Sequence, residues 1–260
     1  MNSKIYFNAS WAISRQGFKI PLWASYSPPM IASDTNSSSH TNATSESFSA
    51  ATNLIEGPAF SPILFIGGVH GDEPEGVWLA ESLLNSLITF HRRKTHQSKV
   101  KSNGHPAWVI IPCLNPEGLS KNERTNSSGV DLNRNFPSPD WSSESKAPRY
   151  FPGEQPATEP EVKAAIQAIE IFQPQLIIHF HSWKPCIVYT GEPAKSMAQV
   201  LSEHSGYPFH EDIGYPTPGS LGQYGWLSKQ IPVICIEEQE GAAREHVWSR
   251  FQWALMDLLK

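Results

Sequence analysis

The chain has 260 residues, of which 39% are hydrophobic and 17% charged, a balance typical of a folded globular protein rather than a disordered one. Its net charge of -5 comes without any basic block, which argues against a nucleic acid partner. No apolar run is long enough to span a bilayer, and residues 1–8 lack the apolar core and cleavage site of a signal peptide. We therefore expect one cytoplasmic α/β domain over residues 1–260 that does not associate with a membrane. Its oligomeric state is not indicated by the sequence.

The N-terminal part predicts a turn, a strand and then a long loop. Residues 13–26 read as a turn followed by a strand, in which Pro21 indicates an edge strand because proline cannot donate a ladder hydrogen bond. From about residue 27 to residue 53 the chain is dominated by Ser, Thr, Asn and Ala, which bury too little apolar surface to become ordered. We expect a mobile surface loop there, whose role the sequence does not indicate.

The next strand, predicted over residues 63–66, ends in two glycines that let the backbone turn sharply. His70 and Glu73 follow, and a helix is predicted from Glu75 to Phe90 by its apolar periodicity. An imidazole and a carboxylate three residues apart can reach one metal ion from the same side, at the strand end where α/β sheets bind ligands. We predict a zinc site here, and we expect Asp72 and Glu75 to be solvated acids at the helix N-terminus.

Strands and helices alternate along the rest of the chain. This alternation predicts a mixed β-sheet with helices on both faces. The polar loop around 124–137 is long for a compact domain, which indicates a functional role. The other elements are expected at residues 108–114 (strand), 158–172 (helix), 176–181 and 186–190 (strands), 194–204 (helix), 231–238 (strand) and 243–259 (helix), with a Gly/Pro/Tyr loop at 213–220.

Two of these strands end in further candidate ligands or acids, His181 and Glu237. Two histidines and one glutamate on zinc leave a fourth position for water, the pattern of a catalytic site. His179 lies on the same strand face as His181, since strand side chains repeat every two residues, so either could be the third ligand. Glu237 and its neighbour Glu238 face opposite ways, so only one of them can point at the metal.

The sequence resembles the zinc carboxypeptidases in four motifs that occur in the family's order. Residues 67–76 resemble the HxxE metal motif and residues 130–136 the motif that binds the substrate carboxylate. Residues 178–182 resemble the strand that ends in the third ligand, and residues 234–237 the strand that ends in the general base. Within the family, the segments HGDEPEG, RTNSSGVDLNRNFP and GYPTPGS are most similar to bacterial murein tripeptide amidases, which cleave between γ-D-glutamate and meso-diaminopimelate.

This resemblance implies one Zn²⁺ per chain, held by His70, Glu73 and His181. It implies that Glu237 acts as the general base and then as the general acid, and that Arg124 stabilises the oxyanion formed on the attacked carbonyl. The family pattern thus favours the second histidine of the HFH segment and the first glutamate of the EE pair.

The resemblance also implies how a substrate is held. Asn133 and Arg134 would bind the free C-terminal carboxylate, for which the planar guanidinium fork is well suited. Asp131 would accept a hydrogen bond from His70 and fix its tautomer. Tyr215 would stand in the place of the family's mobile tyrosine, although the spacing of its loop matches the family less cleanly.

The function expected from these motifs is that of a zinc metallocarboxypeptidase or amidase, which hydrolyses the C-terminal amide bond of short peptides in cell-wall recycling. An acyl-amino-acid deacylase of the succinylglutamate desuccinylase or aspartoacylase type is the alternative, because it shares the HxxE framework. A non-catalytic binding module would lack a ligand or Glu237, whereas this chain has every part. Cys113, Cys186 and Cys235 form no CxxC pair and read as buried thiols in a reducing compartment.

Overall fold

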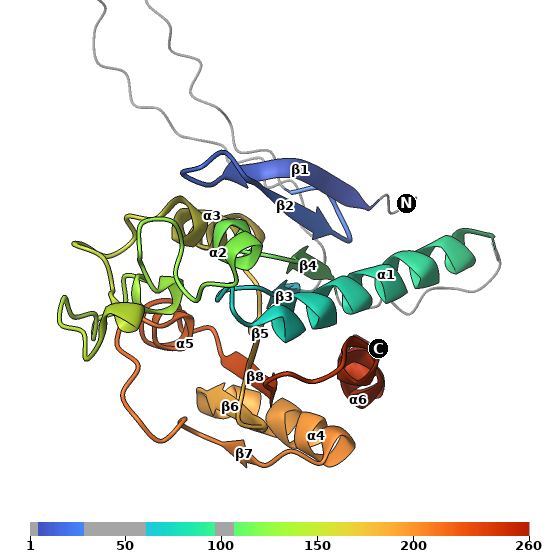
Figure 1. The fold of residues 1–260 in the computed structure, drawn as a ribbon. Helices are drawn as coiled ribbons and strands as arrows, with labels where there is room; N and C mark the ends of the chain where they lie inside the picture. Colours follow the sequence, from blue (N-terminus) through green and yellow to red (C-terminus); the bar gives the residue numbers. More distant parts are fainter. Residues whose placement is uncertain (1–4, 29–60, 97–106, 260) are drawn as a thin grey trace, which may run out of the picture.

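In the computed structural model, residues 5–28, 61–96 and 107–259 are described. The predicted loop at 27–53 lies outside these residues from position 29 onward. The described part of the chain forms one sheet of eight strands in the order β1-β2-β4-β3-β5-β8-β6-β7 (Figure 1). Its strands are β1 Tyr6–Ile13, β2 Lys19–Ala24, β3 Ile63–Ile66, β4 Trp108–Ile111, β5 Leu176–Trp183, β6 Cys186–Thr190, β7 Phe209–His210 and β8 Val233–Gln239. Its α-helices are α1 Pro74–His96, α2 Pro116–Lys121, α3 Pro160–Phe172, α4 Lys195–Ser205, α5 Leu221–Gln223 and α6 Arg244–Asp257.

The middle of the sheet consists of four parallel strands, β4, β3, β5 and β8. Strands β1 and β2 continue it antiparallel on one side, and β6 pairs antiparallel with β8 on the other. Strands β3 and β4 are wholly apolar runs, as expected of strands covered on both faces. The predicted mixed sheet is confirmed, and the carboxyl ends of its parallel strands meet along one edge.

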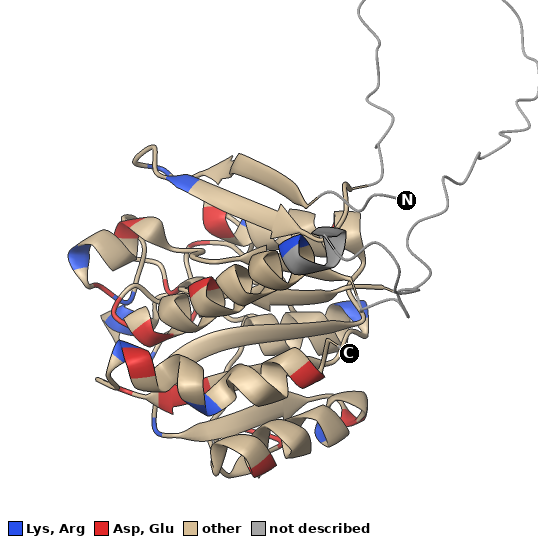
Figure 2. Cartoon of the chain, turned by 90° about the vertical axis from the view of Figure 1, so that its right-hand side faces the viewer, with Lys and Arg blue, Asp and Glu red and all other residues tan. Residues whose placement is uncertain are grey.

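Helices cover both faces of this sheet, as predicted. Alternate strand residues point to opposite sides, so that Ile63 and Phe65 pack into one core with α1, α4 and α6. Leu64 and Ile66 pack into the other core with α3 and α5. Charged residues lie mainly on the helices and connecting loops, and the central strands carry few of them (Figure 2). No described helix is both long enough and apolar enough to cross a membrane.

The interpretation of Pro21 as a residue of an edge strand is wrong. Pro21 belongs to β2, which lies between β1 and β4. The proline is tolerated there because the pairing of β1 with β2 is irregular between Asn8 and Ala12, directly opposite it. The pairing of β2 with β4 is limited to Trp23 and Ala24, so Pro21 takes no part in that ladder either.

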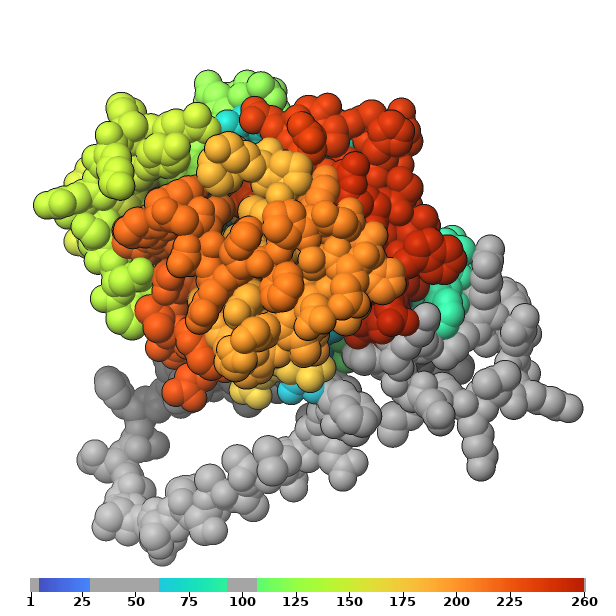
Figure 3. All heavy atoms as spheres, turned by 90° about the horizontal axis from the view of Figure 1, so that it is seen from below, coloured from blue at the N-terminus to red at the C-terminus, as the bar shows by residue number. Residues whose placement is uncertain are grey.

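Two segments flank the carboxyl end of the parallel strands. The long polar loop that contains the 3₁₀ turn Leu132–Arg134 lies beside the segment that runs from α4 through β7 to α5 (Figure 3). In that view the orange segment adjoins α6, drawn in red, on one side and the yellow-green loop on the other. Both segments contribute side chains to the site at the end of the strands.

Candidate active site

Three parallel strands bring the predicted metal and acid residues together. His70 and Glu73 lie in the loop between β3 and α1, where Gly68 adopts a positive φ of 58° that permits the turn. The register of β5 against β8 pairs His181 with Glu237, so their side chains lie on the same face of the sheet. The predicted residues thus meet although they come from distant parts of the chain.

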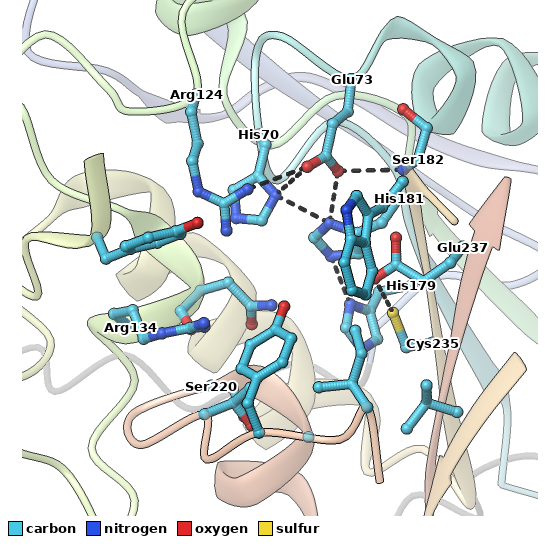
Figure 4. A pocket seen from close by; sticks show the side chains of 18 of the residues that line it. His70, Glu73, Arg124, Arg134, His179, His181, Ser182, Ser220, Cys235 and Glu237 are labelled. Carbon is cyan, nitrogen blue, oxygen red and sulfur yellow. Dashed lines mark hydrogen bonds and ion pairs between the residues drawn. The ribbon is translucent and has the colours of Figure 1, made fainter. Parts of the chain in front are cut away.

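His70, Glu73 and His181 form a cluster of three buried donor atoms (Figure 4). The Nδ1 atom of His70 lies 2.8 Å from Oε1 of Glu73, and the Nδ1 atom of His181 lies 2.7 Å from Oε2 of the same carboxylate. The two Nδ1 atoms are only 3.0 Å apart. Tetrahedral ligands at ordinary zinc bond lengths lie about 3.3 Å from one another, so this donor set fits a zinc ion with small adjustments.

Asp131 and Arg124 form hydrogen bonds and ion pairs with the residues of this cluster. The Nε2 atom of His70 lies 3.0 Å from Oδ1 of Asp131, a carboxylate with no solvent exposure. Arg124 donates from Nε to Asp131 over 3.0 Å and from Nη1 to Glu73 over 3.1 Å. Burial alone would raise the pKa of Asp131, but the charges of His70 and Arg124 overcome it and hold that pKa far below its usual range. Asp131 therefore stays ionised beside His70, as needed to orient a ligating imidazole.

His179, the alternative third ligand, lies on the far side of His181. Its Nδ1 atom is 2.9 Å from Nε2 of His181, while the Nδ1 atom of His181 faces His70 and Glu73. His179, His181 and Cys235 also lie close enough to form a second group of potential ligands. The first group has the two-histidine, one-carboxylate composition of catalytic zinc sites, and in that group His179 supports His181 instead of replacing it.

Glu237 and Glu238 point to opposite faces of β8, as the strand period requires. Glu237 faces the histidine cluster and is 7% exposed, and its burial raises the pKa of its carboxyl group. The thiol of Cys235 donates to Oε1 of Glu237 over 3.4 Å. Glu238 accepts hydrogen bonds from Tyr207 and Arg250 on the other face of the sheet. Only Glu237 of this pair can act on a group bound at the cluster.

Every predicted site residue except Asp131 lines one cavity of about 330 Å³. Tyr215 lines the cavity with part of its side chain exposed, and its ring packs against the Trp183 ring in a T-shaped arrangement with the ring centroids 6.0 Å apart. The cavity also contains residues to which sequence reasoning gave no role in the site, among them Asp72, Arg149, Tyr150, Trp183, Val188 and Thr190. No motif marks these residues, because they meet only once the loops are folded over the strand ends.

Arg134 is a buried cation at one end of this cavity. It is 8% exposed, and it forms no ion pair with any carboxylate among the described residues. Its Nη1 donates to the backbone carbonyl of Asn133 over 2.6 Å. The Asn133 side chain is itself fixed, since its Oδ1 accepts from the backbone N–H of Leu221 over 2.9 Å. A desolvated guanidinium without an acidic partner is costly, which makes this end of the cavity suited to an anion.

Glu75 departs from the expectation of a solvated acid, because it is only 3% exposed. One of its oxygens accepts from the Ser182 hydroxyl over 2.7 Å, and the other accepts from the backbone N–H of Gly241 over 2.8 Å. These bonds tie the start of α1 to the end of β5 and to the segment after β8. Glu75 thus stabilises the scaffold beside the cluster, because the backbone N–H of the same Ser182 donates to Glu73.

Replacing Glu75 by alanine is expected to lower the free energy of unfolding by about 1–3 kcal/mol, since it leaves the Ser182 and Gly241 donors without their partner. Urea unfolding of the two proteins measures the difference. Glu81→Ala serves as the control, because Glu81 forms only an exposed ion pair with Arg244 and should change stability by less than about 1 kcal/mol. Equal stability of the two variants would contradict the role given to Glu75.

Comparison with known protein families gives a consistent result. A sequence profile of the zinc carboxypeptidase family matches residues 37–220. Murein peptide amidase A of Escherichia coli K12 is 31% identical over 210 residues, which cover 76% of this chain and 78% of that protein. Murein peptide amidase A of Vibrio campbellii is 29% identical over 187 residues, which cover 67% and 68% of the two chains.

Solved structures share the fold. The crystal structure of murein-tripeptide amidase MpaA from Escherichia coli O157 superposes with a TM-score of 0.65 at 22% identity, covering 97% of this chain and 91% of that one. Thrombin activatable fibrinolysis inhibitor superposes with a TM-score of 0.69 at 18% identity, covering 99% of this chain and 68% of that one. At these identities the two structures support the arrangement of sheet and helices described above.

Proposed function

Because this chain belongs to the zinc carboxypeptidase family of peptide hydrolases, we propose that it releases the C-terminal residue of short murein peptides. The bond cleaved is the amide between γ-D-glutamate and meso-diaminopimelate. The murein peptide amidases of Escherichia coli and Vibrio campbellii, similar over two thirds or more of this chain, support this choice of substrate. The same comparisons do not favour the deacylase alternative.

The observation that carries the proposal is the position of Arg134. A buried guanidinium without an acidic partner lies in the same cavity as the His70, Glu73 and His181 cluster. A cavity that holds an anion at one end and a hydrolytic centre at the other selects substrates with a free carboxylate close to the bond to be cleaved. A peptide's C-terminal residue has this arrangement.

We assign the hydrolytic roles to residues already gathered at the cluster. Zinc, held by His70, Glu73 and His181, would supply Lewis acidity toward the scissile carbonyl and the attacking water. Glu237 accepts the proton of that water and then donates it to the departing amine, a task suited to a carboxyl group whose pKa burial has raised. Arg124 has N–H groups beyond its bonds to Asp131 and Glu73, and it directs them at the developing oxyanion.

Tyr215 completes the cavity on the solvent side. It is 43% exposed and stacks edge-on against Trp183, so it can contact a bound peptide without being locked in the core. In our proposal its hydroxyl group binds the peptide once the C-terminal carboxylate is seated on Asn133 and Arg134.

We further propose that the reaction occurs in the cytoplasm, on wall fragments that are being recycled. Cys113, Cys186 and Cys235 are all free thiols, which is typical of a protein kept in a reducing compartment. Burial raises the pKa of the Cys113 thiol to about 12 and that of the Cys186 thiol to about 11. These two thiols are therefore poorly reactive and suit a packing role.

Incubation of the zinc-loaded protein with L-Ala-γ-D-Glu-meso-diaminopimelate tests the proposed function. We expect release of free diaminopimelate, which amino-acid analysis of the reaction mixture measures. N-acyl amino acids form the second arm of the experiment and are expected to remain intact. Hydrolysis of the acyl amino acids without hydrolysis of the tripeptide would replace this proposal by the deacylase alternative.

Substitution of Arg134 by methionine is expected to lower kcat/KM for the tripeptide by about 10- to 100-fold, because one charge-assisted contact with the C-terminal carboxylate is lost. The same tripeptide with a C-terminal amide provides the control, since it lacks the carboxylate from the start. The wild type should discriminate strongly between the two peptides and Arg134→Met only weakly. A variant that keeps the full discrimination would show that the carboxylate binds elsewhere.

A further inference from the structure

His179 has a second nitrogen that the proposed mechanism does not use. The residue lines the cavity, and its Nδ1 atom is occupied by the contact with His181. Its Nε2 atom has no hydrogen-bond partner among the described residues, and it is not one of the polar atoms sealed away from solvent. One face of the histidine therefore supports the cluster, and the other opens into the cavity.

The contact between the two histidines determines where the proton of His179 resides. The Nδ1 atom of His181 faces His70 and Glu73, so a His181 that binds zinc through Nδ1 carries its proton on Nε2. That N–H can only donate to the Nδ1 atom of His179, 2.9 Å away, because two N–H groups cannot face each other at this distance. The remaining ring proton of His179 lies on Nε2, which makes that atom a hydrogen-bond donor to the cavity.

The surroundings of His179 place this donor in a small pocket below the cluster. Cys235 pairs with His179 across the two strands, and its thiol is already directed at Glu237. Val188 pairs with Cys235 from the neighbouring strand β6, Thr190 lies two residues further on the same face of β6, and both line the cavity. Gly222 leaves room beside Thr190, because a Cβ on it would come within 3.2 Å of the Thr190 hydroxyl. In Figure 4 His179 lies beneath His181, across the cavity from Arg134.

In our proposal this pocket receives the side chain of the departing residue. In the proposed function the α-carboxylate of that residue lies on Arg134, and its amide bond lies at the cluster. The side chain then extends from between these two points toward His179 and Thr190. A side chain that ends in an acceptor meets an N–H donor there, whereas one that ends only in an ammonium group offers a donor to a donor.

We infer that His179 determines specificity for the departing residue by donating from Nε2 to a carboxylate at the end of its side chain. This inference rests on the proposed function and on the zinc site within it. Diaminopimelate and lysine have the same side chain up to the carbon that bears the second amino group, but diaminopimelate carries an additional carboxylate on that carbon. Recognition of that carboxylate by His179 would separate the two residues.

Two substitutions separate the roles of Nδ1 and Nε2 of His179. His179→Asn keeps an acceptor near the Nδ1 position for His181 but removes the donor to the pocket. His179→Gln keeps an amide N–H near the Nε2 position but loses the acceptor for His181. We expect His179→Asn to retain zinc and to lower the ratio of kcat/KM for the diaminopimelate tripeptide over the lysine tripeptide by about 10- to 100-fold. We expect His179→Gln to keep that ratio and to bind zinc about 10- to 100-fold more weakly.

Binding of the free amino acids, measured by calorimetry on the zinc-loaded proteins, gives a readout that needs no catalysis. The wild type should prefer diaminopimelate to lysine, and His179→Asn should lose most of this preference. A preference unchanged in His179→Asn, or absent in the wild type, would overturn the inference. Preferential binding of diaminopimelate by a wild type that does not cleave the tripeptide would instead refute the proposed function and leave the role of His179 standing.

Discussion

Replacement of Glu237 by glutamine is expected to lower kcat by about 10²–10⁴-fold, the usual contribution of a general acid–base group. Glutamine has nearly the same shape as glutamate and can still occupy the position beside Cys235, but it cannot accept the proton of the attacking water. Because Glu237 is not one of the three clustered donor atoms, the variant should bind as much zinc as the wild type. Kinetics with the tripeptide, together with metal analysis of the purified protein, measure both quantities.

Glu238→Gln is the matched control for this experiment. The residue is the immediate neighbour of Glu237 and is also buried, but it lies on the opposite face and accepts hydrogen bonds from Tyr207 and Arg250. Its substitution should leave kcat close to the wild-type value, although it can reduce stability. Full activity in Glu237→Gln, or an equal loss in both variants, would refute the assignment of the general base.

Substitution of His181 by alanine is expected to abolish activity through loss of the metal. Its Nδ1 atom lies 3.0 Å from that of His70 and 2.7 Å from Glu73, so its removal leaves two donor atoms in place of three. Dialysis against a chelator should inactivate the wild type, whereas the variant should contain little zinc even before dialysis. Added zinc should restore activity to the wild type alone.

The control for this substitution is His204→Ala. His204 is exposed on α4 and bonds only to the backbone carbonyl of Val200 within its own helix. It should bind zinc and hydrolyse the tripeptide like the wild type. Zinc retained at wild-type strength by His181→Ala would refute the assignment of His181 as a zinc ligand, because both groups of potential ligands contain it.

The central part of the fold could be predicted from sequence because its strands are continuous apolar runs. Residues 63–66 are wholly apolar, and residues 176–181 are apolar apart from His179 and His181, a pattern typical of strands buried on both faces. Strand β1 is not predicted, because its pattern of burial is irregular and half of it faces solvent at the edge of the sheet. Strand β7 has two residues, too few for any periodicity to appear.

The residues of the candidate site that belong to a sequence motif could be predicted, whereas those whose surroundings depend on tertiary contacts could not. The HxxE spacing by itself points to His70 and Glu73. In contrast, nothing near Glu75 in the sequence shows that Ser182 and Gly241 will cover it, so a buried bridging acid has the sequence pattern of a solvated one. From the sequence, His179 is only an alternative to His181 as the third ligand. Strand alternation shows that the two residues share a face, but not that Nδ1 of His179 contacts Nε2 of His181.

The pairing of β5 with β8 has a consequence for how this chain can change during evolution. His179 stands opposite Cys235 and His181 opposite Glu237, so the arrangement depends on chain length as much as on residue type. Deletion of one residue near the start of β8 would bring Glu238 to the place of Glu237, and a carboxylate would still face the cluster. The same slip would set Ile236 in the place of Cys235 and close the pocket beside His179 with an aliphatic side chain. The slip would also set Glu237 in the place of Ile236, whose side chain is fully buried in the apolar core with α6, so a carboxylate would enter that core. The number of residues before β8 is therefore constrained by the core of the sheet as well as by the site.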